Sequence, residues 1–229
     1  MSIIRNDLGK TSCSVGRLFL LVAGISVYTL VIADYPAIAQ KGLEQEAADR
    51  GLDLLRVIAQ KPTFTQTFQN YGFDSPEQAT DLKFGRPLQI YWVRLDRLRQ
   101  FHSESDAQQL LEPPFEVMYP VKARGEVTSS ITVRSSQNQK TWKASRFGAA
   151  NLIRRLTQFP QYKNSNSSFV VRIPGFNLYF LGDHIKGQFM LTAIANRPKF
   201  HWEAGQTLPA QQVFSRLVSA AKARGDGPG

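Results

Sequence analysis

Three histidines, His102, His184 and His201, have the widest chemical repertoire of the side chains in this chain. A histidine binds metals and moves protons near neutral pH, so its neighbours decide which chemistry is open to it. No two of the three stand three or four residues apart, the spacing that places two metal ligands on one helix face. Glycine-rich loops of the kind that cradle phosphates are also absent from the sequence. We therefore expect no metal and no cofactor.

Hydrolytic chemistry would have to use Asp183 and His184, the one acid and histidine that are adjacent in the sequence. No Gly-x-Ser-x-Gly elbow accompanies them, and Ser129 and Ser130 fall in the middle of a predicted strand, which is a poor place for a nucleophile. The members of a catalytic triad meet only in the fold. An envelope hydrolase built around His184 and Asp183 is thus the alternative function, and the sequence favours a non-enzymatic protein.

The whole chain has a net charge of +10, and its positive charge is concentrated in one block. Between Glu126 and Asp183 there is no carboxylate, but there are eight basic residues. Clustering of this kind is typical of a face that meets an anionic partner. We expect a membrane surface, an envelope polymer or an acidic protein to dock on residues 127–182, and no nucleic acid. The residues expected to bind it are Arg134, Lys140, Lys143, Arg146, Arg154 and Arg155. A solvated surface without a dedicated partner is the alternative.

The first 39 residues have the three-part pattern of a cleavable signal peptide. Basic residues precede an apolar run at 18–33, and Pro36 and the small-x-small site at 37–39 follow it. Cleavage would leave a mature protein that starts near Gln40, in the periplasm or the thylakoid lumen. Retention of 18–33 as a membrane anchor is the alternative, but the run is shorter than the roughly 20 residues of a spanning helix. Because Cys13 is the only cysteine, the mature chain would have no disulfide and no thiol chemistry.

Hydrophobic periodicity predicts the elements that carry these residues. Helices are expected at 43–60, 148–159 and 209–223, and a central strand, buried on both sides, at 88–94. Further strands are expected at 115–121, 127–133, 140–146, 169–173, 176–181 and 188–195. The order strand-strand-strand-helix thus occurs at 115–159 and again at 169–223. It predicts an α+β fold with a mostly antiparallel meander and helices on one face. We expect one domain at 40–224, with a division near 160–168 as an alternative, and a disordered tail at 225–229.

Short segments of the chain resemble known proteins. The Ala-Ile-Ala end of the leader and the stretches TVRSSQNQKTW (132–142) and FVVRIPGFNLYFLG (169–182) resemble uncharacterised exported proteins of cyanobacteria. The stretch IYWVRLDRLRQF (90–101) and the order of strands and helices are similar to the periplasmic Tic22-like translocation proteins. Both resemblances imply an exported protein, and neither assigns a role to a particular residue.

The signal-peptide prediction is tested by the intact mass of the exported protein. We expect a mass that starts at Gln40 or within a residue or two of it, because small side chains at 37 and 39 fit the peptidase cleft. A mature form that retains residues 18–33 would show instead that the protein is anchored.

Overall fold

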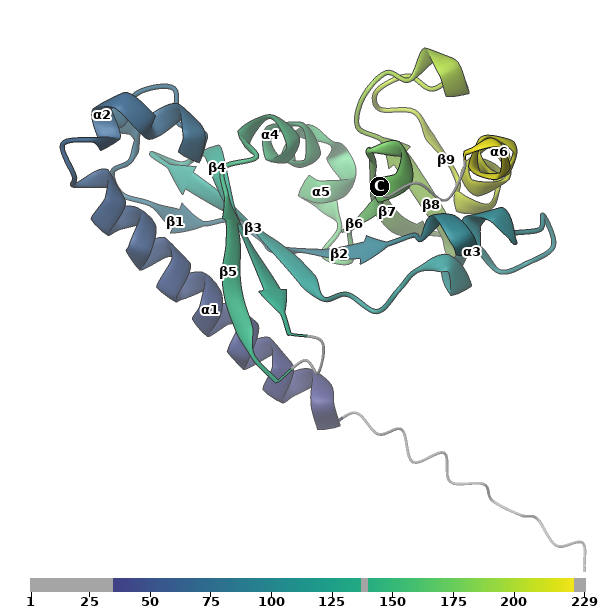
Figure 1. Cartoon of the computed structure of the whole chain (residues 1–229), viewed down its shortest axis with the longest axis horizontal. Coiled ribbons are helices and arrows are strands. Elements are labelled where there is room, and N and C mark those ends of the chain that lie inside the picture. Colours follow the sequence, from purple (N-terminus) through teal and green to yellow (C-terminus); the bar gives the residue numbers. More distant parts are fainter. Residues whose placement is uncertain (1–34, 137–139, 225–229) are drawn as a thin grey trace, which may run out of the picture. The chain divides into compact units, whose positions relative to one another are not determined.

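The computed structural model describes residues 35–136 and 140–224, and within them nine strands form one sheet. The strands follow the order β5-β4-β3-β2-β6-β7-β8-β9, and β1 pairs with β3 beside this path (Figure 1). Their bounds are β1 Lys83–Phe84, β2 Leu88–Trp92, β3 Glu116–Ala123, β4 Glu126–Ser135, β5 Trp142–Phe147, β6 Phe169–Ile173, β7 Leu178–Ile185, β8 Gln188–Ala193 and β9 Thr207–Pro209. All neighbours are antiparallel except β2 and β6, which are parallel. The predicted α+β class with a mostly antiparallel sheet is confirmed.

Helices of very different lengths connect these strands. The α-helices are α1 Tyr35–Ala59, α2 Phe64–Thr67, α3 Leu95–Arg99, α4 Ala150–Gln158, α5 Pro160–Asn164 and α6 Ala210–Ala223. Short 3-10 helices are η1 Phe68–Tyr71, η2 Pro76–Gln78, η3 Ala107–Leu110, η4 Pro174–Phe176 and η5 Pro198–Phe200. In the described part of the chain, no helix combines the length and the apolarity that crossing a membrane requires.

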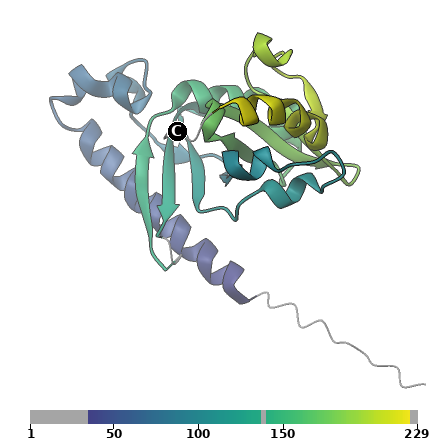
Figure 2. The ribbon, with the colours of Figure 1, turned by 45° about the vertical axis from the view of Figure 1, so that its right-hand side comes forward.

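Helices cover both faces of the sheet, so the expectation of helices on one face is wrong. We call the face that carries Met118 of β3 the first face and the face that carries Val117 the second face. On the first face, Ile153 and Leu156 of α4 pack on Met118 and its neighbours. On the second face, α1 covers one half of the sheet, while α3 and α6 cover the other half (Figures 1 and 2). The physical reason is that most strands carry large apolar residues at successive positions, and both sets need cover.

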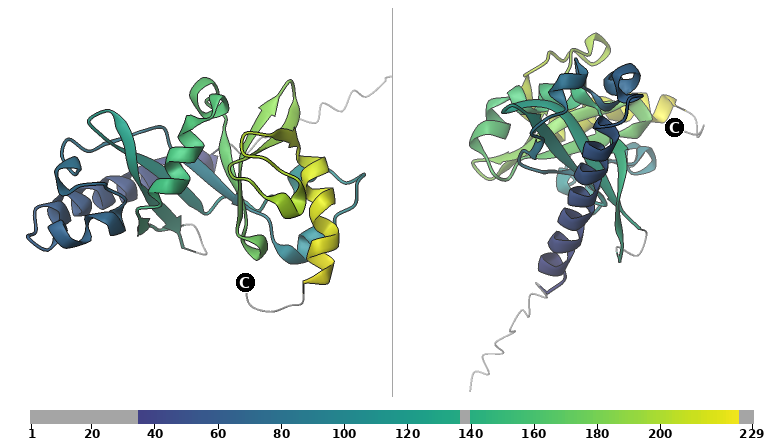
Figure 3. Two further views of the ribbon diagram at one scale, coloured as in Figure 1. Left: turned by 90° about the horizontal axis from the view of Figure 1, so that it is seen from above. Right: turned by 90° about the vertical axis from the view of Figure 1, so that its left-hand side faces the viewer.

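Close approach of α1 to the sheet explains why a glycine occurs in the middle of this helix. A Cβ at Gly51 would lie 3.0 Å from the Cβ of Ala144 and 3.1 Å from a methyl group of Ile131. The backbone of α1 therefore packs closely on β4 and β5 (Figure 3). Leu52 and Leu55, which follow on the same side, are buried against the second face. The packing of α1 on the sheet thus offsets the destabilising effect of a glycine in the middle of a helix.

The parallel pair of β2 and β6 joins two halves of similar order. Strands β2–β5 are followed by α4, and strands β6–β9 are followed by α6. The adjacent residues Val170 and Val171 of β6 point to opposite faces, where Val170 packs with α4 and Val171 with α6. The predicted repetition of strands and helix therefore appears with the two helices on opposite faces. The strand predicted at 88–94 is central, but Gln89 on its second face is exposed.

The predicted leader is almost entirely outside the described residues, as is the tail at 225–229. Helix α1 begins at Tyr35, eight residues before the start expected from periodicity. Pro36 therefore stands in the first turn of α1, where its fixed φ is tolerated. Cleavage before Gln40 would remove the first turn of α1, and the cleavage itself stays a prediction.

The final helix gives a direct test of the packing on the second face. Leu217 is fully buried, together with Val213 and Phe214, whereas Val218 is only partly buried. We expect Leu217→Ala to lower the free energy of unfolding by about 2–5 kcal/mol, because it leaves a cavity in the core. Val218→Ala is the control and should cost less than half as much in the same urea titration. Equal costs would contradict the assigned orientation of α6.

Candidate anion-binding surface

Glu116 is the only acidic residue that is fully buried in the described part of the chain. It opens β3, and its Cα lies opposite Ile90 of β2 and Arg134 of β4. Because side chains alternate along a strand, Glu116 shares the first face with Met118, while Val117 and Tyr119 enter the core under α1. A carboxylate at this depth needs charged partners and hydrogen bonds to stay ionised.

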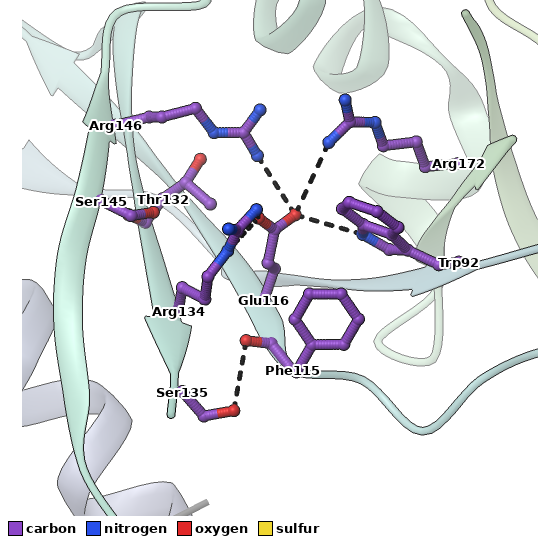
Figure 4. Close-up of polar contacts among 9 residues, drawn as sticks. All are labelled: Trp92, Phe115, Glu116, Thr132, Arg134, Ser135, Ser145, Arg146 and Arg172. Carbon is purple, nitrogen blue, oxygen red and sulfur yellow. Dashed lines mark hydrogen bonds and ion pairs between the residues drawn. The ribbon is translucent and has the colours of Figure 1, made fainter. Parts of the chain in front are cut away.

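Four hydrogen bonds reach the two oxygens of this carboxylate (Figure 4). Arg134 donates to Oε1 through both Nε, at 2.8 Å, and Nη2. Arg146 Nη2 and Trp92 Nε1 donate to Oε2 at 3.1 and 3.2 Å, and Arg172 Nη1 completes an ion pair with the same oxygen at 4.0 Å. A carboxylate has about four lone-pair sites, so the acceptor capacity of Glu116 is used in full.

Aromatic rings lie close to two of these guanidinium groups. The Cζ atom of Arg172 lies 4.6 Å from the ring centre of Trp92 and 5.5 Å from that of Tyr179. Arg134 lies 5.8 Å from the ring of Phe115, which packs on Trp92 at 4.9 Å between ring centres. A cation over an aromatic face is stabilised by the ring quadrupole and also loses rotational freedom. The guanidinium groups are therefore preorganised.

A β-bulge brings Arg146 to the first face. Arg134 pairs with Lys143 and Val133 with Ala144, but the register then shifts so that Thr132 pairs with Arg146. If β5 were regular and Ser145 took part in the alternation, Arg146 would lie on the second face, under α1. The side chain of Ser145 donates to the carbonyl oxygen of Thr132 at 3.0 Å, which satisfies a polar group at the irregularity. The bulge is thus what gives Glu116 its second arginine.

The cluster has an excess of positive charge that faces solvent. One carboxylate is shared by three arginines, so the local net charge is +2. The Arg134 and Arg146 side chains are 47% and 43% exposed, and that of Arg172 is 20% exposed, whereas Glu116 is 0% exposed. Lys143, opposite Arg134, adds another exposed cation on the same face. We call Arg134, Lys143, Arg146 and Arg172 the arginine surface.

The structure brings together three of the six residues that the sequence indicates, namely Arg134, Lys143 and Arg146. Lys140 is exposed and precedes β5. Arg154 serves a different purpose, because its Nη2 bonds Asp74 at 2.9 Å and also approaches the carbonyl oxygens of Gly72 and Thr128. Its side chain is 31% exposed and ties α4 to the segment after η1, so Arg154 lies apart from the cluster around Glu116. Arg155 is exposed and lines a separate cavity.

The side chains of Asp183 and His184 do not form an acid–base pair. As neighbours on β7 they point to opposite faces of the sheet. Asp183 Oδ1 accepts hydrogen bonds from Ser165 and Ser167, at 3.1 and 2.8 Å, and holds the loop before β6. His184 Nε2 lies 3.1 Å from Gln108 Nε2, and its ring stacks on Phe189. The arrangement required by the hydrolase alternative is absent from this pair.

Metal ligands do not converge either. Within residues 35–136 and 140–224 there is no group of three His, Cys, Asp or Glu side chains that could hold a metal ion.

Comparison with protein-family models, with curated proteins and with solved structures finds no match to this chain. The resemblances to exported cyanobacterial proteins and to Tic22-like proteins stay predictions.

Sequence reasoning missed the centre of this surface, Glu116, and two of its partners, Trp92 and Arg172. A signal was present, because Glu116 stands at the start of a strand that is otherwise almost entirely apolar. A lone carboxylate on a buried strand needs a cation nearby, and the carboxylate-free block was the obvious source. Which of the eight basic residues would supply it depends on strand order and on the bulge, and neither can be deduced from spacing.

The role of Glu116 is tested by Glu116→Gln. We expect the variant to lose about 1–3 kcal/mol of unfolding free energy, because the guanidinium groups lose their charged acceptor and repel one another. The cost stays below that of a fully buried pair because water can hydrate the exposed arginines. Glu203→Gln, at an exposed position, is the control and should change stability by less than about 0.5 kcal/mol in the same thermal and urea denaturation. Matching values would show that the buried carboxylate is dispensable.

Proposed function

We propose that this chain is an exported, non-enzymatic binding protein whose basic face docks on an anionic partner. The partner is a membrane surface, an envelope polymer or an acidic protein in the periplasm or the thylakoid lumen. The leader-like pattern of the first 39 residues supports export.

One observation carries the proposal: a buried carboxylate orients three arginines without neutralising them. If the cluster served stability alone, one arginine with two hydrogen bonds would be enough for Glu116. Instead, the bulge in β5 adds Arg146 and the parallel strand β6 adds Arg172, and about half of the Arg134 and Arg146 side chains stays exposed. Exposed guanidinium groups that already bind a buried carboxylate lose less entropy than free ones when they bind carboxylate or phosphate oxygens.

The hydrolase alternative receives no comparable support. Its two named residues lie on opposite faces of β7, and each is already engaged, Asp183 by two serines and His184 by Gln108. A binding function requires only the exposed charge that the first face presents.

The proposal is tested by sedimentation of the protein with acidic lipid vesicles at increasing salt. Binding should fall as salt rises from 0.01 to 0.15 M, since the screening length shortens from about 30 to about 8 Å. The test variant is Lys143→Gln with Arg146→Gln, which leaves Arg134 and Arg172 to hold Glu116. Each basic side chain near an acidic membrane contributes about 1 kcal/mol, so we expect binding to weaken by up to ~30-fold.

The matched control is Arg97→Gln with Arg216→Gln, which removes the same charge from exposed arginines of α3 and α6. Equal weakening by both pairs would show that net charge alone acts, and the docking proposal would be abandoned. Acidic polysaccharide and an acidic protein, assayed in parallel, identify which of the three partners the surface prefers.

A further inference from the structure

A second basic feature is a cavity of about 260 Å³ that involves the first turn of α4, the start of β7 and the end of β8. It adjoins the arginine surface through Tyr179, whose ring lies under Arg172 and also lines the cavity. None of the four residues of the arginine surface lines the cavity itself. A concave site of this size suits a small group and not an extended surface.

Arg155 and Arg197 give the cavity a positive charge, and none of its lining residues is acidic. In the described part of the chain, no carboxylate forms an ion pair with either arginine. Arg197 Nη2 approaches only the carbonyl oxygen of Asn177, at 3.4 Å. Two guanidinium groups with unused donors at one cavity recognise tetrahedral or planar oxyanions.

The first turn of helix α4 borders the same cavity. Asn151 and Leu152, from its first turn, line the cavity, and this turn contains no acidic residue. Ala149, the residue before the helix, provides no side-chain cap. The first N–H groups of α4 are therefore not satisfied by a capping side chain. The exposed amino end of a nine-residue helix reinforces the attraction for an anion that the arginines create.

Apart from Asn177, the remaining wall is apolar, and it contains an unsatisfied donor. Leu152, Ile194 and Tyr179 contribute apolar surface beside the charged groups. Trp202, which also lines the cavity, is 2% exposed, and its Nε1 has no hydrogen-bond partner among the described residues. A ligand with an anionic head and a short uncharged part would match both kinds of wall.

We infer that this cavity binds a phosphate monoester or diester head group, held by Arg155 and Arg197 at the amino end of α4. The inference goes beyond the proposed docking on the arginine surface and uses none of its four residues. The phosphate is either part of a small soluble molecule or the head group of a lipid.

The test uses the full exported protein, with glycerol 3-phosphate and inorganic phosphate as soluble probes at constant ionic strength. We expect saturable binding by calorimetry and a change in tryptophan fluorescence, since Trp202 forms part of the wall. Arg155→Gln with Arg197→Gln should weaken this binding at least tenfold, while Arg97→Gln with Arg216→Gln should leave it within twofold. Trp202→Phe should remove most of the fluorescence change, and circular dichroism verifies that each variant is folded.

Two further experiments distinguish a lipid from a soluble source of the phosphate, and the cavity from the arginine surface. Phosphatidylglycerol vesicles that compete with glycerol 3-phosphate would identify a lipid head group, and vesicles that do not compete would identify a soluble ligand. Lys143→Gln with Arg146→Gln should weaken docking on acidic vesicles but leave binding of glycerol 3-phosphate unchanged. Absence of saturable phosphate binding, or saturable binding of acetate in its place, would overturn the inference whatever the arginine surface does.

Discussion

The carboxylate of Glu116 is the interaction on which the rest of the structure depends, because it connects five neighbouring strands. Trp92 from β2, Arg134 from β4, Arg146 from β5 and Arg172 from β6 all reach its two oxygens from either side of β3. The connection crosses the parallel junction of β2 and β6, where the two halves of the chain meet. A single buried charge of this kind favours one register for all five strands, since a slip by one residue would leave it unpaired.

The two faces of the sheet differ in how much apolar surface they bury. The second face carries two large apolar clusters, one under α1 and one under α3 and α6, and these supply most of the hydrophobic stabilisation. The first face has a smaller cluster under α4, which leaves the strands toward the β5 edge available for charged groups. Most of the hydrophobic stabilisation therefore lies on the second face, opposite the exposed arginines.

Burying an acid beneath basic residues also solves a problem of electrostatics. Three arginines close together repel one another and would separate if they were free. Glu116 offsets most of this repulsion and holds the guanidinium groups in place, while a local charge of +2 remains. The cation–π contacts with Trp92 and Tyr179 act in the same direction. Surface arginines scattered over the molecule, such as Arg97 and Arg216, have no such support.

Local pattern and tertiary structure contributed different parts of this picture. Periodicity and turn residues were enough for the strands β3, β4 and β5, for α4 and α6, and for the α+β class, because each of these depends on contacts near in sequence. Composition was enough to locate the basic block.

The parallel pairing of β2 with β6 was not predictable, since these strands are separated by more than 70 residues and hydrophobic pattern says nothing about strand order. The bulge at Ser145 decided that Arg146 joins Arg134 on the first face, and the ion pair with Asp74 decided that Arg154 does not. The sequence by itself determined which residues could carry charge and which segments form helices and strands. Only the tertiary structure decided which charges meet, because that depends on strand order and on one extra residue in an edge strand.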